Sequence, residues 1–83
     1  MNKIITNLKY DLQNLLSELG HNIYNLKITT FVKENEYYHL TGSCELFDTA
    51  LFGYPKILNF RGTYDPQERE FTSFEILNIV NKI

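Results

Sequence analysis

The hydrophobic period of the chain changes at Gly20, and this change constrains the fold more than any other feature. Before Gly20, apolar residues recur at the three- and four-residue spacing of an amphipathic helix. They are Ile4, Ile5, Leu8, Leu12, Leu15, Leu16 and Leu19. Asn2 is a suitable N-cap, and Gly20 stands where a left-handed residue ends a helix. The pattern therefore predicts one helix over about residues 3–19.

After Gly20, apolar residues alternate with polar ones in four stretches, which is the period of strands covered on one face. The pattern predicts strands over about residues 22–33, 37–47, 56–64 and 70–78. The expected inner face of the first strand is Tyr24, Leu26, Ile28, Thr30 and Val32. The expected fold is α+β, with the N-terminal helix packed on one face of a four-stranded antiparallel meander. Two layers and a single domain over residues 1–83 suit a chain of this length.

The loop lengths set the register that we expect. A three-residue loop at Glu34–Glu36 places Val32 opposite Tyr38 and keeps the apolar faces of the first two strands together. A five-residue loop in the last hairpin places Phe60 opposite Phe74. A loop shorter by one residue would move the apolar side chains of one strand to the opposite face of the sheet, unless a bulge intervened. We therefore expect the longer loops.

The last residues fit more than one structure. Thr72 and Glu75 have the spacing of a helical capping box, and later apolar residues are compatible with a helix. We expect a strand to about Asn78, followed by a frayed or helical tail.

Composition and charge narrow the function classes. The chain has 83 residues and a formal net charge of −2, whereas a dedicated duplex-DNA binder of this size is usually basic. The one cysteine, Cys44, excludes an internal disulfide. Neither a signal peptide nor a run of about 18 apolar residues is recognisable, so we expect a cytoplasmic protein that does not enter a membrane.

The sequence gives no positive support for catalysis or metal binding. His39 and Glu45 would lie roughly 20 Å apart along a strand, too far for a shared acid–base role. Two histidines with one cysteine do not make a zinc site, and Cys44 is expected to be buried. The glycines are scattered rather than grouped in a phosphate-binding loop. We therefore expect no enzyme, no metal and no cofactor; an enzyme using His39 is an alternative without support.

Three surfaces are candidates for partner contacts. The outer sheet face is expected to present Phe31, Tyr37, His39, Arg61 and Phe71. The two hairpin tips, which must point the same way, form an acidic end with Glu34, Glu36, Asp65, Glu68 and Glu70. The loop over residues 48–56 carries Leu51, Phe52 and Tyr54, either as a plug that closes the core or as a contact site.

These features predict a small non-catalytic protein-binding module, such as an inhibitor, an immunity-type protein or an accessory protein. Size and composition alone suggest a phage or mobile-element origin. The main alternative is single-stranded nucleic-acid binding, with bases stacked on the aromatic and basic outer face. Exposed strand edges or the apolar loop would instead favour a homodimer. Helix plus meander is a generic layout and does not by itself imply any of these functions.

Overall fold

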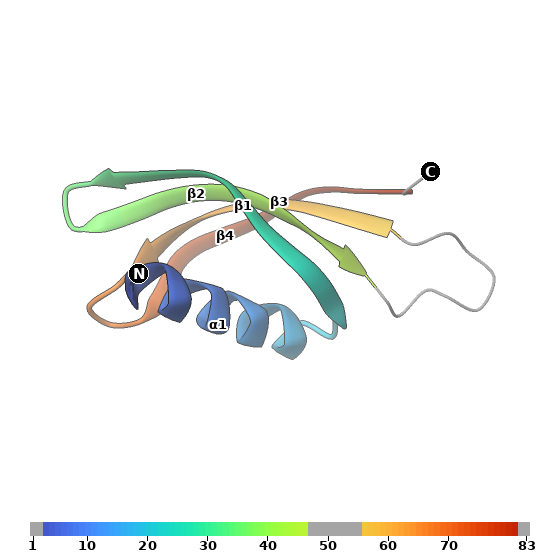
Figure 1. Ribbon diagram of the computed structural model, residues 1–83, viewed down its shortest axis with the longest axis horizontal. Coiled ribbons are helices and arrows are strands. Elements are labelled where there is room, and N and C mark those ends of the chain that lie inside the picture. Colours follow the sequence, from blue (N-terminus) through green and yellow to red (C-terminus); the bar gives the residue numbers. More distant parts are fainter. Residues whose placement is uncertain (1–2, 47–55, 82–83) are drawn as a thin grey trace.

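The structure is a computed structural model that describes residues 3–46 and 56–81. Helix α1 (Lys3–Glu18) precedes strands β1 (Ile23–Glu34), β2 (Tyr37–Leu46), β3 (Lys56–Asp65) and β4 (Glu70–Asn81). The strands form one antiparallel sheet in the order β1-β2-β3-β4, with the helix against one face (Figure 1). This confirms the predicted α+β fold. Leu51, Phe52 and Tyr54 lie outside the described residues, as does the choice between plug and contact site.

The helix ends as its sequence predicts. Gly20 has a φ of 93°, and its N–H donates to the Ser17 carbonyl at 3.0 Å. The His21 N–H donates to the Leu16 carbonyl at 3.0 Å, so the two bonds together form a Schellman motif. Leu19 follows the last helical residue and is 54 % exposed, so it is not part of the buried stripe.

The core lies between α1 and the inner face of the two central strands. Leu8, Leu12 and Leu16 of the helix are fully buried. They meet the even-numbered residues of β2 and β3, as predicted: Tyr38, Leu40, Cys44, Leu46, Leu58, Phe60 and Tyr64. The helix lies beneath the half of the sheet nearest the two hairpin turns, and β3 and β4 extend beyond its C-terminal end (Figure 1).

The first hairpin corrects the predicted register. Glu34 pairs with Tyr37, which leaves a two-residue turn instead of the three-residue loop. Asn35 occupies the left-handed region with a φ of 59°, which asparagine tolerates better than most residues. As a result Val32 lies opposite His39 rather than Tyr38.

Two bulges in β1 then restore the apolar face. The register shifts between Ile28 and Thr30 and again between Tyr24 and Lys27, and each shift inserts one extra residue. The β1 residues that pack against the core are therefore Ile23, Leu26, Ile28 and Phe31. Phe31 stacks on Tyr38 with ring centroids 4.7 Å apart, whereas Val32 is 58 % exposed. The predicted outer position of Phe31 and inner position of Val32 are both wrong.

The second hairpin also has a shorter turn than predicted, followed by a bulge. Asp65 pairs with Glu70, so four residues form the turn instead of five. A bulge at Thr72 then shifts the register, so that Phe71 pairs with Tyr64 on the core side. The ring centroids of Phe71 and Tyr64 are 5.0 Å apart. The predicted outer position of Phe71 is therefore wrong. The bulge also places Glu75 opposite Arg61 instead of burying it.

Strand β4 continues to Asn81, so residues 79–81 are strand and not a helical or frayed tail. Its last part leaves Leu77, Ile79 and Val80 exposed by 46 %, 44 % and 45 %. All the register shifts lie in pairings with the edge strands β1 and β4, whereas β2 and β3 pair without interruption. Bulges of this kind hinder further pairing along a sheet edge.

Candidate functional site: the outer-face groove

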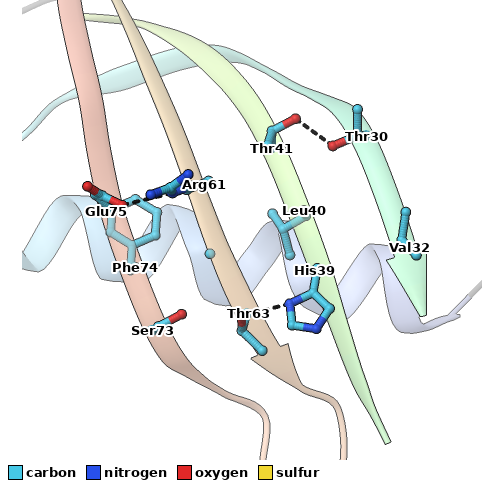
Figure 2. Close-up of a pocket in the computed structure, with 11 residues that line it drawn as sticks. Thr30, Val32, His39, Leu40, Thr41, Arg61, Thr63, Ser73, Phe74 and Glu75 are labelled. Carbon is cyan, nitrogen blue, oxygen red and sulfur yellow. Dashed lines mark hydrogen bonds and ion pairs between the residues drawn. The ribbon is translucent and has the colours of Figure 1, made fainter. Parts of the chain in front are cut away.

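The sheet face turned away from α1 carries a groove of about 660 Å³ that crosses all four strands (Figure 2). Register places the outward side chains of the groove in two transverse rows. The first row is Val32, His39, Thr63 and Ser73, and the second is Thr30, Thr41, Arg61 and Glu75. Leu40, Gly62 and Phe74 complete the lining. We call this feature the outer-face groove.

The groove exists because its central side chains are small. On the two central strands, Thr41 and Thr63 lie diagonally across from each other, because Thr41 pairs with Arg61 and Thr63 pairs with His39. Gly62 of β3 also lines the groove. A Cβ there would point toward the core, within 2.9 Å of the Ser73 carbonyl oxygen and 3.3 Å of the Phe71 and Phe74 rings. The middle of the outer face is therefore lined with hydroxyl groups, close to the main chain.

His39 links the groove to the first hairpin turn. Its Nδ1 lies 3.0 Å from the Thr63 hydroxyl, and its Nε2 lies 2.9 Å from Oε1 of Glu34. With the ring proton on Nε2, the imidazole donates to the carboxylate and accepts from the hydroxyl. The order carboxylate, imidazole, hydroxyl is the one that activates a nucleophile in hydrolases.

The surroundings of His39 give this chain of contacts little electrostatic support. The side chains of His39 and Glu34 are 48 % and 68 % exposed, so water weakens the electrostatic coupling between them. Main-chain N–H groups in a sheet point along its plane toward neighbouring strands. They are therefore poorly placed to stabilise an oxyanion above the face, which is usually the largest contribution to acyl transfer.

Four more polar side chains of the groove are held in pairs across the strands. The Thr30 and Thr41 hydroxyls are 2.6 Å apart. The Nε of Arg61 donates to Oε1 of Glu75 at 2.8 Å, with the two side chains 60 % and 58 % exposed. Such an exposed ion pair contributes at most about 1 kcal/mol to stability, but it orients the guanidinium. Figure 2 shows these pairs bridging neighbouring strands.

Tyr37, His39 and Arg61 have the outer-face register that the sequence predicts, whereas Phe31 and Phe71 face the core. In the described part of the chain, the outward-facing aromatic residues of the sheet are Tyr24 and Tyr37, near its opposite ends. A stacking surface for single-stranded nucleic acid therefore loses the two phenylalanines on which that alternative relied.

The acidic tips do lie at one end of the molecule (Figure 1), but their side chains have different surroundings. Glu34 contacts His39, while Asp65 accepts N–H bonds from Gln67 and Glu68 and so caps its own turn. Glu36 and Glu68 are exposed in the turns, and Glu70 borders a second cleft beside α1.

Sequence reasoning missed Val32 and Thr30 as groove residues because it placed β1 in the wrong phase. Ser73 had the correct outer phase but was not singled out. Asn35 was the available sequence signal for the shorter turn. Two-residue hairpin turns need a residue with positive φ, and asparagine adopts that conformation more readily than most residues. Asp11 was missed for another reason: its partners, Tyr64 and Arg69, are more than fifty residues away in sequence.

Cys44 is buried, as predicted, and burial raises the pKa of its thiol to about 11. Among residues 3–46 and 56–81, no group of three or more His, Cys, Asp and Glu side chains is placed to hold a metal ion. The one helix in those ranges is too short and too polar to cross a membrane.

Comparisons with protein-family models, with curated proteins and with solved structures found no match. A helix on an antiparallel sheet supports many unrelated functions. The fold alone therefore does not indicate what the chain binds or does.

Proposed function

We propose that this protein is a non-catalytic protein-binding module that holds a segment of a protein partner in the outer-face groove. The observation that carries the proposal is the groove itself, which is about 660 Å³ and is lined by residues of all four strands. Its volume lies in the range of roughly 300–1,000 Å³ found for small-molecule pockets, and its extent across the sheet gives room for a polypeptide segment. An inhibitor, an immunity-type protein or an accessory protein, phage-encoded or not, would act in this way through surface contacts with its protein partner.

The small side chains of the groove support contact with a polypeptide. Hydroxyl groups of Thr41, Thr63 and Ser73 can each donate or accept, so they can satisfy the peptide groups of a bound segment. Val32, 58 % exposed at one side of the groove, supplies apolar contact. Side chains of a partner can approach the sheet closely where its residues are short.

The cross-strand hydrogen bonds supply a second argument. His39 is held between Glu34 and Thr63, Thr30 is paired with Thr41, and Arg61 with Glu75. Side chains that are already ordered lose less conformational entropy when a partner binds. The groove therefore resembles a preformed surface more than one that must rearrange.

Affinity capture from the native host with matched variants tests the proposal. Ser73 and Asn78 are both exposed outer-face residues of β4, but only Ser73 lines the groove. Wild-type protein and Asn78→Arg should retain a stoichiometric protein partner, whereas Ser73→Arg, which fills the groove, should weaken its binding at least about tenfold. Equal binding by all three proteins, or no protein partner, would contradict the proposal.

A second candidate function is hydrolysis with Thr63 as nucleophile, which the Glu34–His39–Thr63 chain of contacts favours. Hydrolysis of p-nitrophenyl acetate by wild type and by Thr63→Val separates the two functions. The binding proposal expects equal rates, because the exposed histidine acts only as any surface imidazole does. A rate that falls at least tenfold in Thr63→Val, with the fold intact by circular dichroism, would favour the enzyme.

A further inference from the structure

A second cleft, of about 330 Å³, lies between α1 and the beginning of β4, where α1 covers the inner face of the sheet. Its lining residues are Asp11, Asn14, Leu15 and Glu18 of the helix with Arg69, Glu70, Phe71 and Phe74. We propose that this cleft binds the side chain of an arginine or a lysine from a partner polypeptide. The cleft shares Phe74 with the outer-face groove but lies on the other face of the sheet, and the proposal goes beyond the function proposed for the groove.

The cleft has an apolar side that suits the stem of a long side chain. Leu15, Phe71 and Phe74 are each half-buried and pack against the core while also lining the cleft. The rings of Phe71 and Phe74 meet edge to face with centroids 6.0 Å apart. The methylene groups of arginine or lysine commonly lie along apolar surface of this kind while the charged end stays near water.

The charged residues that line the cleft favour a positively charged ligand. Asp11 is already bound by Arg69, with nitrogen–oxygen distances of 2.9 and 3.1 Å, so this pair forms a neutral wall. The carboxylates of Glu18 and Glu70 belong to exposed residues of the same cleft. Three carboxylates and one guanidinium leave two negative charges beside an apolar surface, which complements a cation on an aliphatic stem.

Other occupants fit these features less well. An acidic side chain would meet like charges, and an uncharged apolar side chain would desolvate Glu18 and Glu70 without any compensation. A cation that follows the apolar wall would also approach the half-buried ring of Phe71, where aromatic faces attract positive charge. The combination therefore favours arginine or lysine.

Titration of the isotope-labelled full chain with N-acetyl-arginine methylamide, followed by NMR, tests the proposal. The matched probes are N-acetyl-norleucine methylamide, which keeps an aliphatic stem, and N-acetyl-glutamate methylamide, which reverses the charge. We expect saturable shifts of the Phe71 and Phe74 ring signals with the arginine probe and with neither of the others. A ligand of this size should bind in the millimolar range.

Matched variants locate the charge effect. Glu18→Gln with Glu70→Gln should weaken arginine binding about fivefold to tenfold, while Glu36→Gln with Glu68→Gln makes the same charge change outside the cleft and should not. Equal weakening by both pairs, equal binding of the norleucine probe to the wild type, or no ring shifts would each overturn the proposal. The methyl signals of Thr41 and Thr63 should stay still, which keeps this test independent of the groove.

Discussion

The phenol oxygen of Tyr64 lies 2.6 Å from Oδ2 of Asp11, and this bond ties the end of β3 to the middle of α1. Arg69, from the turn before β4, donates to both oxygens of the same carboxylate. Burial of Asp11 raises its pKa, but the hydrogen bonds from Arg69 and Tyr64 and the charge of Arg69 outweigh that effect. The pKa of Asp11 is therefore held below its ordinary value of 3.8.

This shift predicts a loss of stability in acid. Because the folded-state pKa of Asp11 is lowered, its contribution is present above pH 3.8 and is lost as the pH falls below that value. We expect Asp11→Asn to lower the free energy of unfolding at neutral pH by about 1–2 kcal/mol, and the difference from wild type to shrink in acid. Urea unfolding at several pH values measures this. Glu68→Gln, a charge change in the exposed turn, is the control; an equal loss there would contradict the prediction.

Tyr64 predicts the opposite pH dependence. Burial, followed by the hydrogen bond and charge of Asp11, raises the pKa of Tyr64 from 10.0 to about 12. Its contribution is therefore complete below pH 10 and is lost as the pH rises through 12. In an absorbance titration of the tyrosines, Tyr64 should ionise only as the pH approaches 12. Tyr64→Phe should cost about 1 kcal/mol at neutral pH, whereas Tyr10→Phe should cost nothing measurable.

The phase of β1 predicts contrasting effects at adjacent residues. Phe31→Ala removes a ring that stacks on Tyr38 and should lower the free energy of unfolding by about 2–4 kcal/mol. Val32→Ala, at a side chain that is 58 % exposed, should change it by less than about 0.5 kcal/mol. Denaturant unfolding of the two variants decides the register. A larger loss of stability from Val32→Ala than from Phe31→Ala would contradict the bulged register and support a β1 strand that alternates without bulges.

Cys44 predicts a thiol that reacts only when the protein opens. The side chain is 1 % exposed, and its pKa is raised to about 11 by burial, so little thiolate is present or accessible at neutral pH. Labelling by a disulfide reagent should be slow in the native protein and immediate in concentrated denaturant. Rapid labelling without denaturant would show that the helix does not cover this part of the sheet as described.

The sequence predicted the elements and the faces of the central strands but not the phase of the edge strands. Strands β2 and β3 pair without a shift, so the alternation that marks Leu40 and Phe60 as inner residues holds throughout. Each edge strand contains two bulges, and alternation counted across a bulge assigns the wrong face. Phe31 and Phe71 were misplaced for this reason, and the groove was hidden by the same error.

Each of the two shorter turns contains a residue with positive φ, and the sequence indicates these positions only weakly. Asn35 and Arg69 adopt positive φ values of 59° and 56°, and each ends or begins a tight turn. Asparagine is common at positive φ and arginine is not. The first turn could therefore have been predicted from the sequence, but the second could not. At Arg69 the guanidinium contact with Asp11 accompanies the left-handed backbone, and that contact exists only in the folded chain.

Methyl NMR of the protein with its captured partner shows whether the outer-face groove is the binding site. Binding in the groove should shift the methyl signals of its lining residues Thr30, Val32, Thr41 and Thr63, and should leave those of Leu77, Ile79 and Val80 unchanged. Shifts confined to the three exposed residues of β4, with the groove methyls unmoved, would contradict it and assign binding to the apolar end of the sheet instead.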